Sequence, residues 1–212
     1  MTRIKICGIT TARDAEWAAE CGADALGFQF AESPRRIEPP EAREIAGALD
    51  PFVARVGVFV NLPAAEVRQA LDMSGCTVAQ LHGAESPECV RSLSPYAVIK
   101  AFRVSDSIDE ERLRAYADAS ALLLDTYVAG VAGGTGRRFD HALAAALVEK
   151  GWRVIVAGGL TPENVAQVVS SVRPYGVDVG SGVEAAPGRK DREKVRDFIA
   201  AVRAADRGRA ER

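Results

Sequence analysis

The feature of this sequence that most constrains its fold is a strict alternation of two apolar patterns along the whole chain. Short runs rich in Val, Ile and Leu, typical of buried strands, alternate with Ala-rich runs whose apolar residues recur at helical spacing. We expect eight strands, at 3–7, 24–30, 53–60, 77–81, 97–102, 121–125, 153–157 and 176–179. We expect a helix after each of them, at 12–21, 40–49, 64–73, 87–93, 109–118, 140–150, 162–172 and 191–203.

Eight evenly repeated strand–helix units predict a closed (β/α)8 barrel, the TIM barrel, in a single α/β domain. A doubly wound open sheet is the alternative, but it rarely repeats so evenly. The GxGxxG fingerprint of dinucleotide-binding sheets is also missing after the first strand. We assign residues 1–205 to the barrel and 206–212 to a polar C-terminal tail, and we expect the chain to fray after Arg203.

Composition excludes several classes of partner. The net charge of −2 gives no basic footprint for nucleic acid, and no apolar run is long enough to cross a membrane. Arg3 and Lys5 interrupt the opening apolar run, which argues against a signal peptide. With two histidines and four widely spaced cysteines, we expect no metal site, no disulfide framework and a reducing, cytoplasmic setting; the cysteines are Cys7, Cys21, Cys76 and Cys89.

In a barrel of this kind the chemistry lies where the strands end, at the carboxyl edge. Cys7 ends the first expected strand, and Asp125 ends the sixth after four apolar residues. A partly desolvated carboxylate suits a general acid, and a thiol across the barrel mouth suits a second proton-transfer group. On position alone, Cys7 is more typical of simple packing, as most free cysteines are, and Asp125 is also compatible with helix capping or an ion pair. If both are chemical, their opposed positions favour an isomerisation.

Anion-binding candidates gather at the same edge. Glycines follow the sixth, seventh and eighth strands, where backbone N–H groups can approach a phosphate; the candidates are Gly133, Gly134, Gly158, Gly159, Gly180 and the adjacent Ser181. Arg35 or Arg36, after the second strand, can hold a carboxylate, and we expect at least one of the two on the surface. His82 follows the fourth strand, where a lone histidine is more typical of a hydrogen-bonded structural residue than of a catalyst.

The chain contains a series of short sequence blocks, most of them at the ends of the expected strands, in an order that is found in one protein family. They are KICGIT (5–10), GADALGF (22–28), SPR (33–35), VGVFVN (56–61), QLHG (80–83), LDT (124–126), GGTG (133–136), GGLTPENV (158–165), SGVE (181–184) and PG (187–188). This set resembles the phosphoribosylanthranilate isomerase family and covers essentially the whole chain.

The resemblance implies a step of tryptophan biosynthesis. In it, N-(5-phosphoribosyl)anthranilate becomes 1-(2-carboxyphenylamino)-1-deoxyribulose 5-phosphate by an Amadori rearrangement without a cofactor. It implies that Cys7 is the general base, Asp125 the general acid and Arg35 the group that binds the anthranilate carboxylate. The glycine loops would bind the phosphate, and we expect His82 to be a further substrate-binding residue. A small phosphorylated substrate is then the expected partner, with the chain a monomer or a homodimer.

Two positions depart from the family's pattern. Gly180 stands where the family usually has serine, and His141 stands where an aromatic residue commonly follows the Phe-Asp pair. Gly180 keeps open a related isomerase that acts on another N-glycosidic or aldose phosphate. A non-catalytic barrel that binds a phosphorylated metabolite is a further alternative, against which the presence of both Cys7 and Asp125 argues.

Overall fold

The computed structural model describes residues 1–47, 49–103, 110–125 and 141–210. Eight parallel strands close into a barrel in chain order, with β8 paired back onto β1. The strands are β1 (Arg3–Cys7), β2 (Ala25–Gln29), β3 (Ala54–Phe59), β4 (Val78–Leu81), β5 (Ala97–Arg103), β6 (Ala121–Asp125), β7 (Val154–Ala157) and β8 (Gly176–Val179). Closure rules out the open sheet and confirms the predicted TIM barrel.

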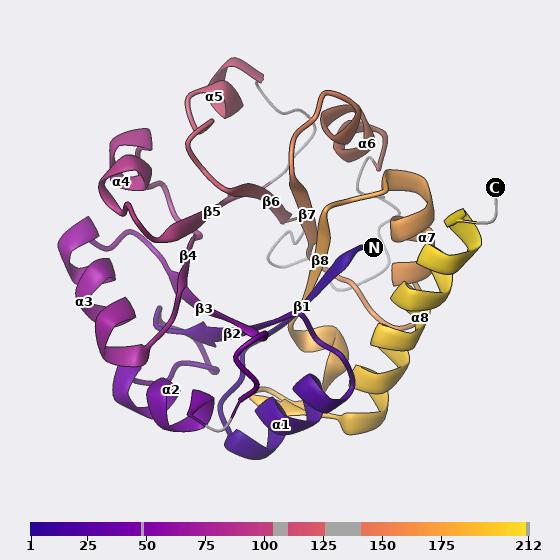
Figure 1. Cartoon of the computed structure of the whole chain (residues 1–212), viewed down its shortest axis with the longest axis horizontal. Helices are drawn as coiled ribbons and strands as arrows, with labels where there is room; N and C mark the ends of the chain where they lie inside the picture. Colours follow the sequence, from indigo (N-terminus) through magenta and orange to yellow (C-terminus); the bar gives the residue numbers. More distant parts are fainter. Residues whose placement is uncertain (48, 104–109, 126–140, 211–212) are drawn as a thin grey trace.

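The helices form a ring around this barrel (Figure 1). They are α1 (Ala12–Glu20), α2 (Pro39–Ala46), α3 (Ala64–Ser74), α4 (Pro87–Ser92), α5 (Glu110–Arg114), α6 (His141–Glu149), α7 (Val165–Val172) and α8 (Arg192–Ala210). Two features of the described chain were not predicted: a 3-10 turn, η1 (Ser181–Val183), and an antiparallel hairpin of β9 (Glu184–Ala186) and β10 (Arg189–Lys190). Both follow β8, where they add residues to the barrel mouth.

Strand periodicity divides the apolar residues into two cores. One set of side chains packs between the strands and the helices, including Ile4, Ile6, Phe28 and Leu124. The alternate positions fill the barrel interior with Val56, Ile99, Ala101, Ala121, Leu123, Ile155 and Ala157. This period-2 alternation determines which polar residues of each strand face the centre.

Two helices, α5 and α7, are shorter than the sequence predicts. α5 has five residues, and the chain beyond it turns through i→i−3 bonds such as Tyr116 N–H to Leu113 C=O. α7 begins three residues late, because the Asn164 carboxamide accepts from the Thr161 N–H and donates to the Gly159 C=O, which closes a turn there instead.

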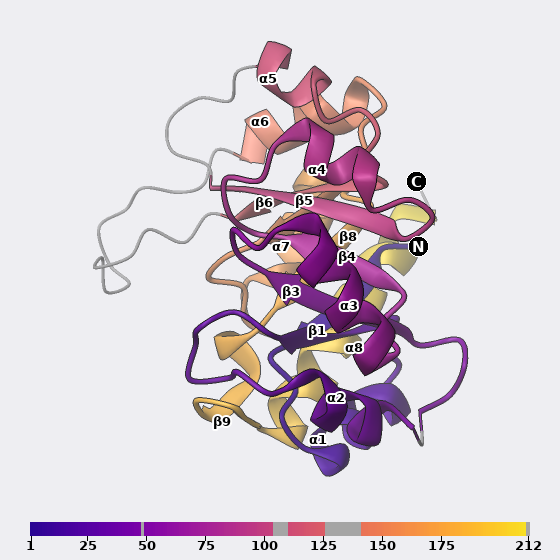
Figure 2. The ribbon, with the colours of Figure 1, turned by 90° about the vertical axis from the view of Figure 1, so that its left-hand side faces the viewer.

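We expected the chain to fray after Arg203, and this is wrong: α8 continues to Ala210. Asp206 accepts hydrogen bonds from the Thr2 N–H at 2.7 Å and the Thr2 hydroxyl at 2.9 Å. Arg203 donates to the Thr2 carbonyl and to Asp24. These bonds fasten the last helix to the start of the chain, and both termini lie at the same end of the barrel (Figure 2). The division of the chain at residue 205 stays a prediction.

The start of α1 shows how the first strand turns into its helix. Thr11 is the N-cap, and its hydroxyl accepts from the Asp14 N–H at 3.1 Å. The neighbouring Thr10 donates its hydroxyl to the Gly188 carbonyl, so it connects this loop to the β9–β10 hairpin. Gly8 has a φ of +78°, a conformation that L side chains rarely adopt.

Candidate active site

The proposed acid and base both face the barrel interior at its carboxyl end. On β1, Ile4 and Ile6 pack outward, so Lys5 and Cys7 project inward. On β6, Leu122 and Leu124 belong to the outer core, and Asp125 projects inward above Leu123. β9 lies at this same end, opposite the chain termini (Figure 2).

Cys7 lies next to a buried ion pair. The Lys5 ammonium is 3.0 Å from each carboxylate oxygen of Asp178 on β8, and both side chains are buried. A Cβ built on Gly27 would lie 2.8 Å from Cys7 Sγ and 3.0 Å from Lys5 Nζ, so both atoms crowd over this glycine of β2. Only a residue without a side chain leaves the thiol room here.

The charges around the Cys7 thiol oppose one another. Burial raises the pKa of the Cys7 thiol, Lys5 works against that rise, and Asp178 adds to it. Burial alone would lower the pKa of Lys5, but Asp178 and Cys7 outweigh burial and the pKa is raised. Lys5 therefore remains an ammonium, while the free protein holds Cys7 mostly as the neutral thiol.

Asp125 is paired with His82, which ends β4. Nε2 of His82 lies 3.0 Å from Oδ2 of Asp125, and Nδ1 lies 3.1 Å from Nε2 of Gln80. With the Gln80 amide as donor, Nδ1 of His82 accepts and the Nε2–H of His82 donates to Oδ2 of Asp125. From the sequence, His82 was a candidate for substrate binding. In the structure it contacts Asp125, the candidate general acid.

The arginine pair after β2 divides into two environments. The Arg35 guanidinium donates two hydrogen bonds to Glu184, through Nε at 2.7 Å and Nη2 at 2.6 Å, and its stem lies over Gly8. Arg36 is exposed and donates to Glu38 at 2.9 Å. One arginine therefore lies at the barrel mouth beside Cys7 and the other on the surface, as the sequence led us to expect.

The loops after β7 and β8 lie against each other. Gly158 and Gly159 have φ values of +88° and +65°. A Cβ built on Gly182 would lie 1.8 Å from the Leu160 carbonyl oxygen, so the two loops touch through backbone at that point. Ser181 opens η1, and a Cβ on Gly180 would have the Cys7 carbonyl oxygen at 3.8 Å. Gly133, Gly134 and the whole 127–138 loop lie outside the described residues.

Four residues near these groups had no role in the sequence interpretation. Asp178 and Gly27 surround Lys5 and Cys7, while Glu184 and Lys190 surround Arg35. Period-2 alternation on the eighth strand was a usable signal for Asp178, since it sits in register with Lys5. No sequence signal predicts the hairpin that brings Glu184 and Lys190 to the mouth.

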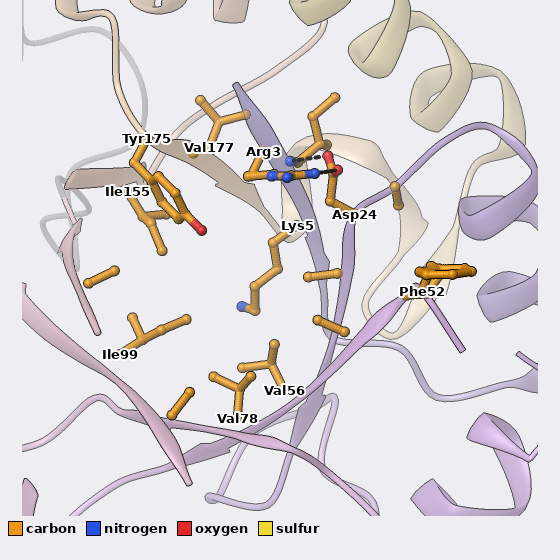
Figure 3. A pocket seen from close by; sticks show the side chains of 18 of the residues that line it. Arg3, Lys5, Asp24, Phe52, Val56, Val78, Ile99, Ile155, Tyr175 and Val177 are labelled. Carbon is orange, nitrogen blue, oxygen red and sulfur yellow. Dashed lines mark hydrogen bonds and ion pairs between the residues drawn. The ribbon is translucent and has the colours of Figure 1, made fainter. Parts of the chain in front are cut away.

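The opposite end of the barrel is hollowed. A hollow of about 920 Å³ is lined there by residues near the strands' amino ends, among them Val56, Ile99 and Tyr175, with Lys5 reaching in from β1 (Figure 3). Phe52 stands at its edge with 93% of its surface exposed.

Within the described ranges, no group of three or more His, Cys, Asp or Glu side chains is placed to hold a metal ion. In the same ranges, none of the helices has the length and apolar content to cross a membrane.

Comparison with known proteins identifies the family. The family model described as N-(5'phosphoribosyl)anthranilate (PRA) isomerase matches residues 4–201. The chain belongs to this family. It is 53% identical over 203 residues to the N-(5'-phosphoribosyl)anthranilate isomerase of Geobacter sp. strain M21, which covers 94% of this chain and 97% of that protein.

Solved isomerase structures agree with the fold. The phosphoribosylanthranilate isomerase of Thermotoga maritima superposes with a TM-score of 0.89 at 42% identity, covering 96% of this chain and all of that one. A second isomerase structure, 40% identical with a TM-score of 0.86 and the same coverage, contains reduced 1-(o-carboxyphenylamino)-1-deoxyribulose 5-phosphate. A third, 39% identical with a TM-score of 0.85 and again the same coverage, is of monomers generated from the dimeric Thermotoga maritima isomerase.

This family membership establishes the activity. The chain is an aldose–ketose isomerase of tryptophan biosynthesis that acts on N-(5'-phosphoribosyl)anthranilate. The alternatives of a related isomerase with another substrate and of a non-catalytic barrel are thereby set aside.

Proposed function

We propose that Cys7 is the general base and Asp125 the general acid of this isomerisation. The observation that carries the proposal is the inward placement of the two side chains at the carboxyl end of the barrel, each held by its own polar partners. Asp125 is bonded to His82, and Cys7 adjoins the Lys5–Asp178 pair. In this fold that end is where substrates bind and react.

The chemistry begins with two proton transfers. In its carboxylic-acid form, Asp125 gives its proton to the furanose ring oxygen, and the C1′–O bond breaks to give a cationic Schiff base with the anthranilate nitrogen. Cys7 then removes the C2′ proton, its electron pair moves toward the iminium, and the resulting enolamine tautomerises to the ketose. Each acid or base group is expected to contribute roughly 10²–10⁴-fold to the rate.

Ionisation of Cys7 is coupled to the first step. Burial keeps the pKa of the free thiol above its ordinary value. The Schiff base formed by Asp125 is a cation next to the thiol, and a nearby positive charge favours the thiolate. Ring opening thus produces the charge that makes the base effective, while Lys5 holds the pKa of Cys7 lower than burial alone would.

The two ends of the substrate are bound by different groups. Arg35 receives the anthranilate carboxylate, since its guanidinium keeps N–H groups beyond those used by Glu184. The backbone around Gly158, Gly159, Gly180 and Ser181 receives the phosphate, together with Gly133 and Gly134. The close contact of Gly182 with Leu160 supports a joint site formed by the loops after β7 and β8.

Complementation of a tryptophan auxotroph that lacks this step tests the roles of Cys7 and Asp125. Wild type should restore growth, and both Cys7→Ala and Asp125→Asn should fail although the proteins fold. Growth of the Asp125→Asn strain at the wild-type rate would refute the general-acid role. Purified Arg35→Ala should fold normally and show a raised KM for the substrate.

We also propose that the chain forms a homodimer in a reducing, cytoplasmic setting. Four cysteines without disulfides support the setting. The exposed Phe52 beside the hollow in Figure 3 is the kind of surface that a second copy covers, and a Thermotoga maritima relative is dimeric. Light scattering of wild type and Phe52→Asp tests this: the wild type should have twice the mass of the variant. A monomeric wild type would refute the dimer.

A further inference from the structure

Glu184 is the residue that fixes the position of the Arg35 guanidinium. It accepts from Arg35 through both carboxylate oxygens, Oε1 at 2.7 Å and Oε2 at 2.6 Å, in the planar two-point geometry that arginine and carboxylate favour. Arg35 is itself 26% exposed, whereas the Glu184 side chain is 5% exposed. The bond therefore joins a partly accessible cation to an anchor that is almost fully buried.

Glu184 is held from its other side by the hairpin. Lys190 Nζ lies 2.9 Å from Oε1, and the Gly188 N–H donates to the same oxygen at 3.3 Å. Lys190 pairs with Glu184 across the β9–β10 ladder, and none of its side chain is exposed. Burial would raise the pKa of Glu184, but Arg35 and Lys190 outweigh it and the pKa is lowered. Glu184 is thus an ionised carboxylate with a fixed orientation.

The same lysine reaches the loop after β8. Lys190 Nζ donates to the Gly180 carbonyl at 3.1 Å as well as to Glu184. Gly180 belongs to the proposed phosphate loop, so one buried ammonium connects the carboxylate-binding and phosphate-binding sides of the mouth. Arg35, Glu184 and Lys190 together carry one net positive charge, which matches the single carboxylate of the substrate.

Arg35 retains donors for a ligand in this arrangement. Glu184 uses Nε–H and one Nη2–H, and Nη1 donates to none of the described residues. The stem of Arg35 rests on Gly8, directly after Cys7, with Cδ 2.5 Å from where a Cβ of Gly8 would be. The unused edge of the guanidinium is therefore held beside the residue proposed as the base.

We propose that Glu184 is a positioning residue for substrate specificity: it holds Arg35 so that its free edge selects a substrate with an aryl carboxylate. This inference rests on the proposed binding of the anthranilate carboxylate by Arg35. A purely structural role for Glu184, fastening the hairpin to the barrel, would affect all substrates alike. The two roles therefore differ in how the effect of a mutation depends on the substrate's carboxylate.

The test compares two substrates on the same enzyme preparation. One is N-(5-phosphoribosyl)anthranilate, and the other is N-(5-phosphoribosyl)aniline, which lacks only the carboxylate. The ratio of their kcat/KM values is the carboxylate preference. A misfolded fraction lowers both values equally, so the ratio reports the folded enzyme alone.

We expect Glu184→Gln to lower the carboxylate preference about tenfold, mainly through a higher KM for the anthranilate substrate, because Arg35 loses its ionic anchor. Glu184→Asp, which keeps the charge on a shorter side chain, should fall between wild type and Glu184→Gln, and it replaces the glutamine variant if that variant does not fold. Arg35→Ala should lower the preference by tenfold or more.

Glu85→Gln is the matched control. Glu85 is also a buried carboxylate in an ion pair, 2.8 Å from Lys100, and its bonds do not involve Arg35. It should leave the carboxylate preference unchanged even if it lowers stability. An unchanged or increased preference in both Glu184 variants, with the Arg35→Ala loss present, would overturn the positioning role while leaving the carboxylate site intact. An unchanged preference in Arg35→Ala would overturn both.

Discussion

Nε2 of His82 lies 3.0 Å from Oδ2 of Asp125, so the histidine that ends β4 contacts the proposed general acid on β6. The two residues are 43 positions apart in the chain, and the barrel brings them together. We propose that His82 acts on the reaction through Asp125 and not through the substrate.

His82→Leu should therefore lower kcat about tenfold while KM stays within about twofold, the expected cost of one hydrogen bond to a charged group. His82→Gln, which keeps a donor near Asp125, should recover part of the loss. Steady-state kinetics of the two variants checks this. A raised KM at unchanged kcat would instead make His82 a direct substrate ligand, as the sequence suggested.

Lys5 and Asp178 should shift the ionisation of Cys7 in opposite directions. Lys5 lowers the pKa of Cys7 and Asp178 raises it. Lys5→Met should move the acid limb of the kcat/KM profile to higher pH, and Asp178→Asn should move it to lower pH. The rate of Cys7 alkylation by iodoacetamide against pH gives an independent measurement. If both variants moved the acid limb in the same direction, the opposite effects of Lys5 and Asp178 on the pKa of Cys7 would be contradicted.

Gly182→Ala should destabilise the loops after β7 and β8. The new methyl group would be 1.8 Å from the Leu160 carbonyl oxygen, so backbone must move. We expect a loss of about 2–4 kcal/mol in the free energy of unfolding, measured in urea, and a raised KM. Gly208→Ala is the control. Gly208 lies in α8, and a Cβ built on it has no atom within 4 Å, so this substitution should stabilise the protein by about 0.5–1 kcal/mol.

Asp24 should make stability fall in acid. It accepts from Arg3 at 2.8 Å, Arg203 at 2.8 Å and the Ile4 N–H at 2.9 Å. Burial works against its charge, but these partners outweigh burial and the pKa of Asp24 is lowered.

A lowered carboxyl pKa contributes stability that is present above the unfolded pKa and lost as pH falls through the folded one. Asp24→Asn should therefore cost about 1–3 kcal/mol at neutral pH and less in acid. Urea unfolding of wild type and Asp24→Asn at neutral and at acid pH measures this loss of stability. An equal loss at the two pH values would show that the charge of Asp24 contributes nothing.

The sequence predicts this barrel well because its signals are local and repeated. Each strand is a compact apolar run, and the bounds of β1, β6 and β8 agree with the expectation at every residue. Cys7, Asp125 and Arg35 could be proposed as site residues because this fold places chemistry at the strand ends and the loops after them, where their family blocks lie.

The remaining features depend on contacts between distant segments. Thr2 and Asp206 extend α8 through bonds that span 204 positions, and no helical pattern near Arg203 indicates them. Glu184 was visible in a family block, but its partner Arg35 lies 149 positions away and is brought near by the hairpin. Side-chain bonds of this range arise from the closed barrel, and a linear pattern does not contain them.

The central claim, that Cys7 removes the C2′ proton after Asp125 opens the ring, is tested most directly by a deuterium isotope effect. kcat/KM is measured with substrate carrying hydrogen or deuterium at C2′, for wild type and for Cys7→Ser. A serine hydroxyl is a much weaker base at neutral pH, so proton removal becomes rate-limiting and the isotope effect should rise well above that of wild type. The same substrates with Asp125→Asn should give an isotope effect near one, because ring opening then limits the rate. An isotope effect in Cys7→Ser no larger than that of wild type would contradict the role of Cys7 as the base.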